Sequence, residues 1–173
     1  PIGGAFSFDV NARGAGDLEY QWRVDGVNIK GANQSALQLA GLELSDAGVY
    51  TVEVTNAAGI TTSEEADLDV LMPVSVGTHP SDQSVVSGDS VLFDAVFVGS
   101  SPIEYQWFFN EIPIKGETSA SMTIKNVSVE NLGHYHVVAS NPVSTTISDP
   151  AKLTVNLPPS ISQHPVAKSA VKG

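Results

Sequence analysis

The sequence repeats itself with a period of 85 residues, and this feature constrains the fold more than any other. When the 173-residue chain is shifted against itself by 85 positions, 27 of the 88 overlapping pairs are identical and no gap is needed. Tyr20-Gln21-Trp22 coincides with Tyr105-Gln106-Trp107, and His79-Pro80 coincides with His164-Pro165. Repetition at a fixed spacing indicates one structural unit built more than once, so the sequence predicts tandem copies of a small domain.

Within one repeat, apolar and polar residues alternate in short stretches. Phe6 and Phe8 are separated by a polar residue, and so are Tyr50 and Val52. Alternation with period two places such residues on one face of a β-strand. Turn-forming pairs such as Asp25-Gly26 separate the stretches, and no stretch has the period of a helix. About seven short strands per repeat are typical of an antiparallel β-sandwich with Greek-key connections, so the predicted fold class is all-β.

The order of these landmarks resembles the intermediate-type immunoglobulin domain. It is most similar to the cysteine-less versions that occur in tandem in bacterial surface and secreted proteins. The resemblance rests on Tyr20-Gln21-Trp22, Lys30-Gly31, Asp46-Ala47-Gly48-Val49-Tyr50 and Asn56-Ala57-Ala58-Gly59. It implies a buried strand-C tryptophan and a tyrosine corner in each repeat. The residues assigned to these roles are Trp22 and Tyr50 in the first repeat, and Trp107 and Tyr135 in the second.

The chain contains no cysteine, although the family usually has a disulfide between its two sheets. The resemblance assigns the two cysteine positions to Val10 and Val52 in the first repeat, and to Ala95 and Val137 in the second. A disulfide that closes such a loop contributes about 2–4 kcal/mol to stability. We therefore expect apolar packing against each tryptophan to replace the bridge. The second repeat has Asn131 where the first has Asp46, which predicts that a corner contact made through Asp46 is absent there.

The repeat also predicts the domain organisation. Residues 1–72 are expected to form a first domain that lacks its own strand A, and residues 73–156 a second domain. Residues 157–173 are expected to hold a linker and either the strand A of a following domain or a donor strand. Two interpretations stay open: the chain is a window on a longer array, or residues 158–173 of one copy complete the sandwich of another. Pro73 at the first junction, and Pro158 and Pro159 at the second, restrict the backbone there and predict a semi-rigid, extended rod.

Composition excludes several classes of function. Nineteen acidic residues against eight basic ones give a net charge of −11, so nucleic acid is not an expected partner. The absence of cysteine excludes thiolate catalysis and cysteine-based zinc sites. The sequence has no G-x-S-x-G nucleophile turn, no phosphate-binding glycine loop and no apolar run long enough for a membrane span. We expect no enzyme activity, no catalytic residue and no cofactor.

Two of the four histidines lie close together in the second repeat. His134 and His136 flank Tyr135, so strand alternation turns both imidazoles away from the core. Two outward imidazoles could bind a metal ion, but no acidic residue or histidine near them in sequence supplies a third ligand. The sequence therefore favours a solvated pair over a metal site.

One surface of the second repeat differs in character from its counterpart in the first. Alternation predicts that Phe108, His136 and Val138 face outward from neighbouring strands, where the first repeat has Arg23, Thr51 and Glu53. An apolar patch present in only one repeat is a candidate contact site. The alternative is that an aromatic residue directly after the tryptophan is a structural feature of the family.

These observations favour a structural or adhesive element, such as a stalk or fibre, in an extracellular or cell-surface protein of bacterial source. Its expected partners are other repeats of the same protein or neighbouring copies, with an unidentified protein or glycan ligand left open. One alternative is an accessory carbohydrate- or protein-binding module of a secreted enzyme. Another is a filament subunit that assembles by strand donation from residues 158–173.

Overall fold

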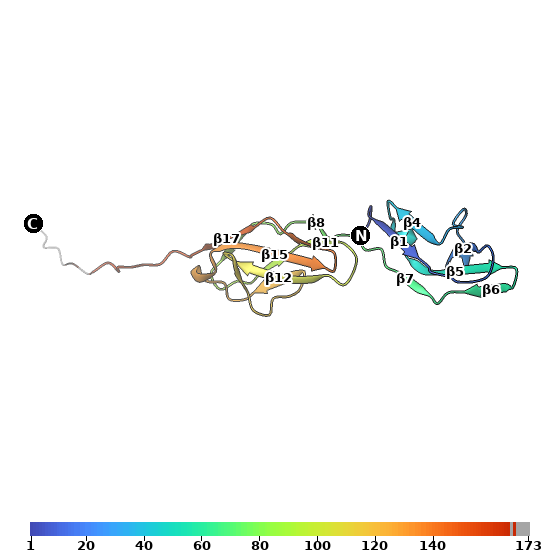
Figure 1. The fold of residues 1–173 in the computed structure, drawn as a ribbon. Helices are drawn as coiled ribbons and strands as arrows, with labels where there is room; N and C mark the ends of the chain where they lie inside the picture. Colours follow the sequence, from blue (N-terminus) through green and yellow to red (C-terminus); the bar gives the residue numbers. More distant parts are fainter. Residues whose placement is uncertain (167, 169–173) are drawn as a thin grey trace, which may run out of the picture. The chain divides into compact units, whose positions relative to one another are not determined.

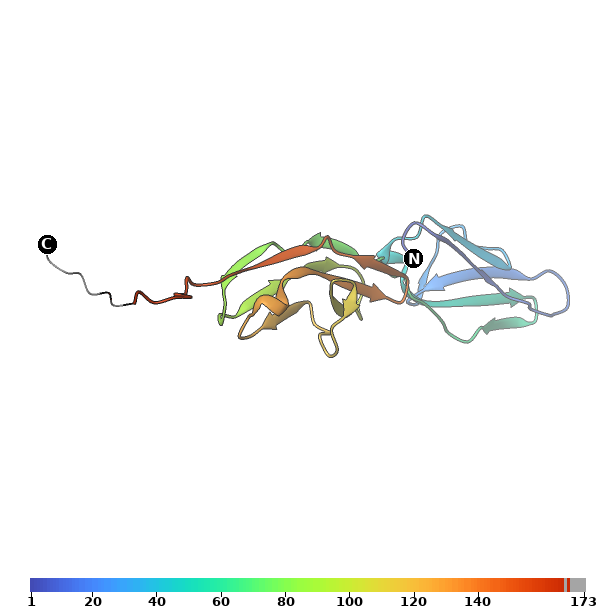
Figure 2. The same cartoon turned by 90° about the vertical axis from the view of Figure 1, so that its left-hand side faces the viewer.

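The computed structural model describes residues 1–166 and residue 168, and their regular secondary structure consists of β-strands and two 3-10 turns (Figure 1 and Figure 2). Residues 167 and 169–173, the remainder of the predicted donor strand, lie outside the described residues. The chain divides into two compact units. One comprises Pro1–Ser75, Val98–Ile103 and Ser140–Thr146, and the other comprises Val76–Phe97, Glu104–Ala139 and the described residues from Ile147 onward. The predicted all-β fold is confirmed, while the predicted domain boundaries at residues 72 and 156 stay a prediction.

The first repeat builds one sheet of two strands and one of five. The small sheet pairs β1 (Ala5–Asp9) with β4 (Ala36–Ala40). The larger sheet has the order β3 (Val27–Asn28), β2 (Glu19–Val24), β5 (Gly48–Asn56) and β6 (Gly59–Thr62), with β7 (Ala66–Leu68) also paired with β5. A 3-10 turn, η1 (Leu44–Asp46), precedes β5. The strand pairs β1–β4, β2–β3, β2–β5, β5–β6 and β5–β7 are antiparallel, as alternation predicts for a sheet with one buried face.

The second repeat has the same plan with three more strands, β8, β9 and β11. The pair β10 (Val91–Asp94) and β14 (Ser121–Ile124) matches β1 and β4. The main sheet has the order β13 (Ile112–Pro113), β12 (Glu104–Phe109), β15 (Gly133–Asn141), β17 (Ala151–Asn156) and β9 (Gln83–Val86), and β16 (Ser144–Ile147) also pairs with β15. A separate pair joins β8 (Ser75–Thr78) to β11 (Val96–Val98), and η2 (Val129–Asn131) precedes β15. The strand β9 runs parallel to β17.

A tryptophan lies at the centre of each core. Trp22 is 4% exposed and Trp107 is 0% exposed. Each indole N–H donates a hydrogen bond of 2.9 Å to a backbone carbonyl, that of Gln34 in the first repeat and that of Ser119 in the second. The buried donor is therefore satisfied, which a tryptophan needs if its ring is to be removed from water without a penalty.

The disulfide positions are filled by apolar side chains beside these rings. Val52, Val137 and Ala95 are buried, whereas Val10 is only half-buried. An aromatic pair strengthens each core: Phe8 lies 4.8 Å from Tyr50 and Phe93 lies 4.9 Å from Tyr135, measured between ring centroids. Phe6 shares the alternation of Phe8 and packs edge-on against its ring at 4.9 Å between centroids, but it remains 45% exposed.

The tyrosine corner is made in both repeats, and the expected loss of this contact in the second is wrong. The Tyr50 hydroxyl donates to the backbone carbonyl of Asp46 at 2.8 Å, and the Tyr135 hydroxyl donates to that of Asn131 at 2.8 Å. Since the acceptor is a main-chain atom, the exchange of Asp for Asn leaves the bond intact. Asp46 and Asn131 each end a 3-10 turn, and their side chains accept from the backbone N–H of the residue that caps the start of that turn, Glu43 or Ser128.

The glycine of the Asp-x-Gly-x-Tyr motif is explained by a close approach of the turn after strand β2 or β12. Asp25 and Asn110 occupy left-handed turn positions with φ of 49° and 46°. Their side chains accept from Val49 N–H at 2.9 Å and His134 N–H at 3.0 Å. A Cβ at Gly48 would lie 2.9 Å from the Asp25 carboxylate, and one at Gly133 would lie 2.5 Å from the Phe109 ring.

This geometry predicts that Gly133→Ala destabilises the second repeat. The added methyl group would force the Phe109 ring and the Asn110 amide apart, and overpacking of this kind costs about 1–3 kcal/mol. Urea unfolding followed by circular dichroism measures the change. Leu132→Ala, at an exposed neighbouring position, serves as the control and is expected to have a small effect. Equal stability of Gly133→Ala and the wild type would contradict the steric explanation.

A second prediction concerns alkaline pH. Burial raises the pKa of Tyr135 to about 12, above the value of about 10 for an exposed tyrosine. A raised folded-state pKa means that the neutral phenol stabilises the fold below pH 10, and that this contribution is lost as the pH rises from 10 through about 12. In Tyr135→Phe, loss of the corner bond costs about 1 kcal/mol at neutral pH.

The stability difference between wild type and Tyr135→Phe is therefore expected to shrink above pH 10, since the variant has no phenol to ionise. Urea unfolding at a series of pH values checks this, with Tyr105→Phe as a control on a tyrosine outside the corner. A difference that stays constant up to pH 12 would show that the Tyr135 hydroxyl is not held in its neutral form.

Candidate interaction face

The outward face of the second repeat holds a parallel stack of two rings. Phe108 on β12 and His136 on β15 lie with their ring centroids 4.9 Å apart and their planes only 4° from parallel. The two strands are neighbours in the sheet, so the rings are cross-strand partners on its outer side. Backbone pairing therefore places one flat aromatic surface directly on the other.

The structure corrects the expectation that His134 and His136 form a solvated pair. His134 is exposed, but His136 is only 7% exposed although it faces away from the core. The Phe108 ring covers it from one side. Its Nδ1 atom lies 3.8 Å from the Glu111 carboxylate, which is itself exposed. His136 is thus part of the packed face rather than a free ligand.

Apolar residues extend this face beyond the positions predicted from the sequence. Val138 is half-buried on β15, two residues after His136. Ile147 on β16 is 60% exposed, and Pro113, the cross-strand partner of Phe108, is also exposed. We call Pro113, Phe108, His136, Val138 and Ile147 the apolar face. Position-by-position comparison of the repeats identifies Pro113 and Ile147, because the aligned residues in the first repeat are Asn28 and Thr62.

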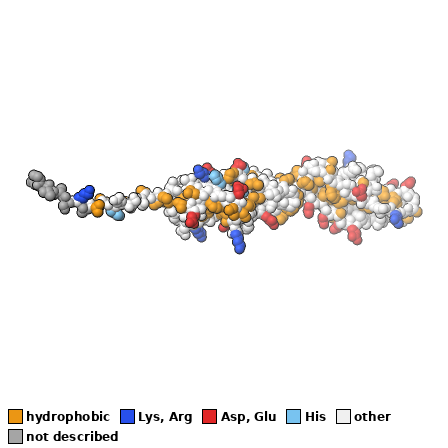
Figure 3. Space-filling model, turned by 60° about the vertical axis from the view of Figure 1, so that its left-hand side comes forward, with side chains coloured by type: hydrophobic (Ala, Val, Ile, Leu, Met, Phe, Trp, Pro, Cys, Tyr) orange, Lys and Arg blue, Asp and Glu red, His pale blue; other side chains and the backbone are white. Residues whose placement is uncertain are grey.

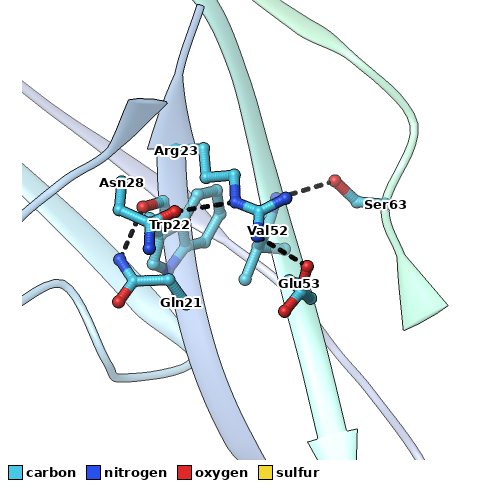
Figure 4. A network of polar contacts seen from close by, with 7 residues as sticks. All are labelled: Gln21, Trp22, Arg23, Asn28, Val52, Glu53 and Ser63. Atoms are coloured by element: carbon cyan, nitrogen blue, oxygen red, sulfur yellow. Dashed lines mark hydrogen bonds and ion pairs between the residues drawn. The ribbon is translucent and has the colours of Figure 1, made fainter. Parts of the chain in front are cut away.

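The same surface of the first repeat is polar and bonded to itself. Figure 4 shows Arg23 between two partners: its guanidinium Nε donates to Asn28 at 2.8 Å, and its Nη2 lies 2.7 Å from the Glu53 carboxylate. The Gln21 amide donates to the carbonyl of Trp22 (Figure 4) and also to that of Ile29. The counterpart Gln106 makes the same two bonds. The strand geometry is therefore shared, and only the outward side chains differ between the repeats.

Hydrophobic side chains reach the surface of the second repeat over a broad area on the side in view, with acidic and basic groups around it (Figure 3). Contiguous apolar surface of this kind is a recognised mark of contact sites. Within the described residues, no group of three or more His, Asp or Glu side chains is arranged to hold a metal ion. The described part of the chain also contains no helix long and apolar enough to cross a membrane.

Comparison with known families gives one match for each repeat. The immunoglobulin I-set domain family matches residues 1–70, and an immunoglobulin domain family matches residues 73–141.

Comparison with curated proteins gives animal relatives. The mouse protein "Cell adhesion molecule DSCAML1" is 30% identical over 92% of this chain, and the human "Roundabout homolog 3" is 29% identical over 95% of it. The chain spans only 9% of the first and 13% of the second. These and other relatives come from mouse, human and chicken, which contradicts the expectation of a bacterial source.

Comparison with solved structures gives the same architecture. A three-domain fragment of titin, I67–I69, superposes with a TM-score of 0.77 at 21% identity, over 90% of this chain and 60% of that one. The four N-terminal immunoglobulin domains of Dscam1 isoform 6.9 superpose with a TM-score of 0.70 at 21% identity, over 90% of this chain and 42% of that one. Together with the family matches, these findings show that the chain belongs to the immunoglobulin domain family as a tandem of cysteine-less immunoglobulin-like domains.

Proposed function

We propose that this chain is a non-enzymatic, adhesive segment of an extracellular or cell-surface protein, in which the apolar face of the second repeat contacts another protein. The observation that carries the proposal is the contrast between the repeats. At matched positions the first repeat has an internally paired Arg23–Glu53 surface, whereas the second presents Phe108 and Val138. The curated relatives support the adhesive class, since they include a cell adhesion molecule and a "Netrin receptor DCC".

The composition of the apolar face favours a protein partner over a sugar. Interface centres are depleted in charge and enriched in aromatic residues, as this face is. A sugar platform requires an aromatic ring with a free flat side. Both tryptophans are buried in the cores, so neither offers its ring to a sugar. The partner we favour is a second copy of the same protein, because its apolar face has the same chemistry and can pack against this one.

The proposal also includes a mechanical role, in which the tandem repeats form a stalk or rod. The proline residues at Met72-Pro73-Val74 and at Leu157-Pro158-Pro159 stiffen the two junctions predicted from the repeat. Repetition of one sandwich at fixed length suits a spacer that presents a contact surface away from its anchor.

Self-adhesion of the chain tests the proposal. Microscopic beads coated with the wild-type chain are expected to cluster, and Phe108→Ser is expected to weaken clustering about tenfold or more, because truncation of a central aromatic removes a dominant share of binding energy. Arg23→Ser, at the matched position of the first repeat, is expected to cluster like the wild type. The double variant Val138→Thr and Ile147→Thr is also expected to weaken clustering, because it removes apolar surface from the same face. It leaves the stack of Phe108 on His136 in place.

Circular dichroism establishes that each variant is folded before the clustering is compared. Wild-type beads that stay dispersed would contradict adhesion between copies. Equal clustering of Phe108→Ser, the double variant and the wild type would show that adhesion uses a different surface.

A further inference from the structure

One residue of the apolar face can change its charge. His136 is 7% exposed, and its ring lies on that of Phe108 with the centroids 4.9 Å apart and the planes 4° from parallel. The other members of the face, Pro113, Val138 and Ile147, have no ionisable group. Histidine is the side chain that ordinarily gains or loses a proton between roughly pH 5 and pH 8. The apolar character of the face therefore depends on pH at a single position.

One carboxylate lies close to this imidazole, that of Glu111 in the turn between β12 and β13. It lies 3.8 Å from Nδ1 of His136, and the Glu111 side chain is 87% exposed. A contact between these two groups is an ion pair only when the imidazole carries a proton. Glu111 is therefore the counter-ion of a protonated His136 in the free chain, where it is also in contact with water.

The other charged residues and histidines on the neighbouring elements are all exposed. They are His134 on β15, Lys152 on β17, Asp149 before β17 and Glu104 at the start of β12. Lys152 is paired with His134 rather than with His136, and the Asp149 carboxylate lies 3.6 Å from Nε2 of His79. Strands β13 and β16 have no such residue, and the tyrosines of β12 and β15 pack on the core. A proton on His136 would therefore be the one charge carried by the face itself.

Protonation has different consequences for the free face and for the covered face. In the free chain the charged imidazole keeps its place on Phe108, because a cation is attracted to the flat side of an aromatic ring. Glu111 and water also stabilise the charge there. When a partner covers the face, the same charge is removed from water and surrounded by apolar groups, which is unfavourable. The neutral imidazole has no such penalty and packs like the rest of the face.

The covered face therefore favours neutral His136, and it binds the proton less tightly than the free chain does. Linkage gives the direction of the effect. Affinity is complete at a pH at which the imidazole is neutral, and it falls as the pH drops and the free chain takes up the proton. A symmetric contact between two copies contains His136 twice, so the penalty applies twice. The first repeat offers no such response, since the residue at the matched position is Thr51.

We propose that His136 makes adhesion through the apolar face depend on pH, so that two copies bind while the imidazole is neutral and separate when it is protonated. This regulation rests on the proposed adhesive function of the face. A face made only of apolar residues would bind equally at neutral and at acid pH, so the response depends on the single imidazole within it.

Clustering of chain-coated beads at about pH 7.5 and about pH 5.5 tests this regulation. Wild-type clustering is expected to weaken about tenfold at the lower pH, the effect of one unit of difference in proton affinity between the free and the covered face. His136→Phe keeps an aromatic ring against Phe108 but cannot take up a proton, so it is expected to cluster equally at both values. His134→Gln removes the exposed imidazole of the same strand and is expected to keep the wild-type response.

Overall charge works in the opposite direction. The chain has a net charge of −11 with neutral histidines, and acidification makes it less negative. Repulsion between coated beads is then reduced, which favours clustering. A loss of clustering at acid pH is therefore not a consequence of the overall charge of the chain.

A second substitution applies if phenylalanine disturbs the packed site. His136→Thr places the residue of the first repeat at this position. It is expected to cluster more weakly than the wild type at neutral pH, but equally at both pH values. Circular dichroism at both pH values establishes that each variant is folded.

The outcomes separate adhesion from its regulation. Wild-type beads that stay dispersed at neutral pH would remove the adhesive function and this regulation with it. Wild-type beads that cluster equally at both pH values leave adhesion in place and overturn the regulation alone. A loss at acid pH that persists in both His136→Phe and His136→Thr also overturns it, because the responsible proton is then bound elsewhere.

Discussion

The hydrogen bond from each buried indole to the backbone is the interaction on which both sandwiches depend. Trp22 and Trp107 each reach a carbonyl twelve residues further along the chain and fix that segment against the core. Tryptophan buries about 150–250 Å² of surface, and a satisfied N–H removes the penalty that would otherwise offset this gain. With valine and alanine in place of a disulfide, the ring and its partners must supply contact that is covalent in other members of the family. The small domain tolerates the loss because the aromatic contacts of Phe8 and Phe93 with the corner tyrosines lie in the same core.

Features of the fold that depend on side-chain pattern can be predicted from the sequence, whereas contacts made through backbone atoms are harder to predict. The all-β fold follows from the 85-residue repeat and strand alternation, and the buried positions of both tryptophans follow from the resemblance to the immunoglobulin domain. The resemblance also gives both corner tyrosines, but the identity of residue 131 does not predict whether the corner bond forms, because the acceptor is its backbone carbonyl. Likewise the motif glycine is explained only by the approach of Asn110 and Phe109, which belong to a different turn of the chain.

The apolar face also shows what strand alternation does not predict. Alternation correctly gives the outward direction of His136, but direction does not determine exposure. A neighbouring strand places Phe108 flat against the imidazole and leaves it 7% exposed. Pro113 and Ile147 belong to the face through strand pairing, which a single-strand pattern does not report. The internal repeat partly compensates for this, because a second copy of each position shows which apolar residues replace polar ones.

Divergence between the two repeats separates what the fold needs from what it presents. The indole bond, the corner bond and the glycine contact recur at matched positions, so they are requirements of the sandwich itself. The outward surface does not recur: one repeat uses Arg23 and Glu53 to satisfy each other, and the other leaves Val138 and Ile147 facing outward. Such a difference is not required by stability, since the polar version supports the same sheet. Selection for a contact explains an apolar surface on one repeat better than folding does, because exposed apolar area gives no stability to the isolated chain.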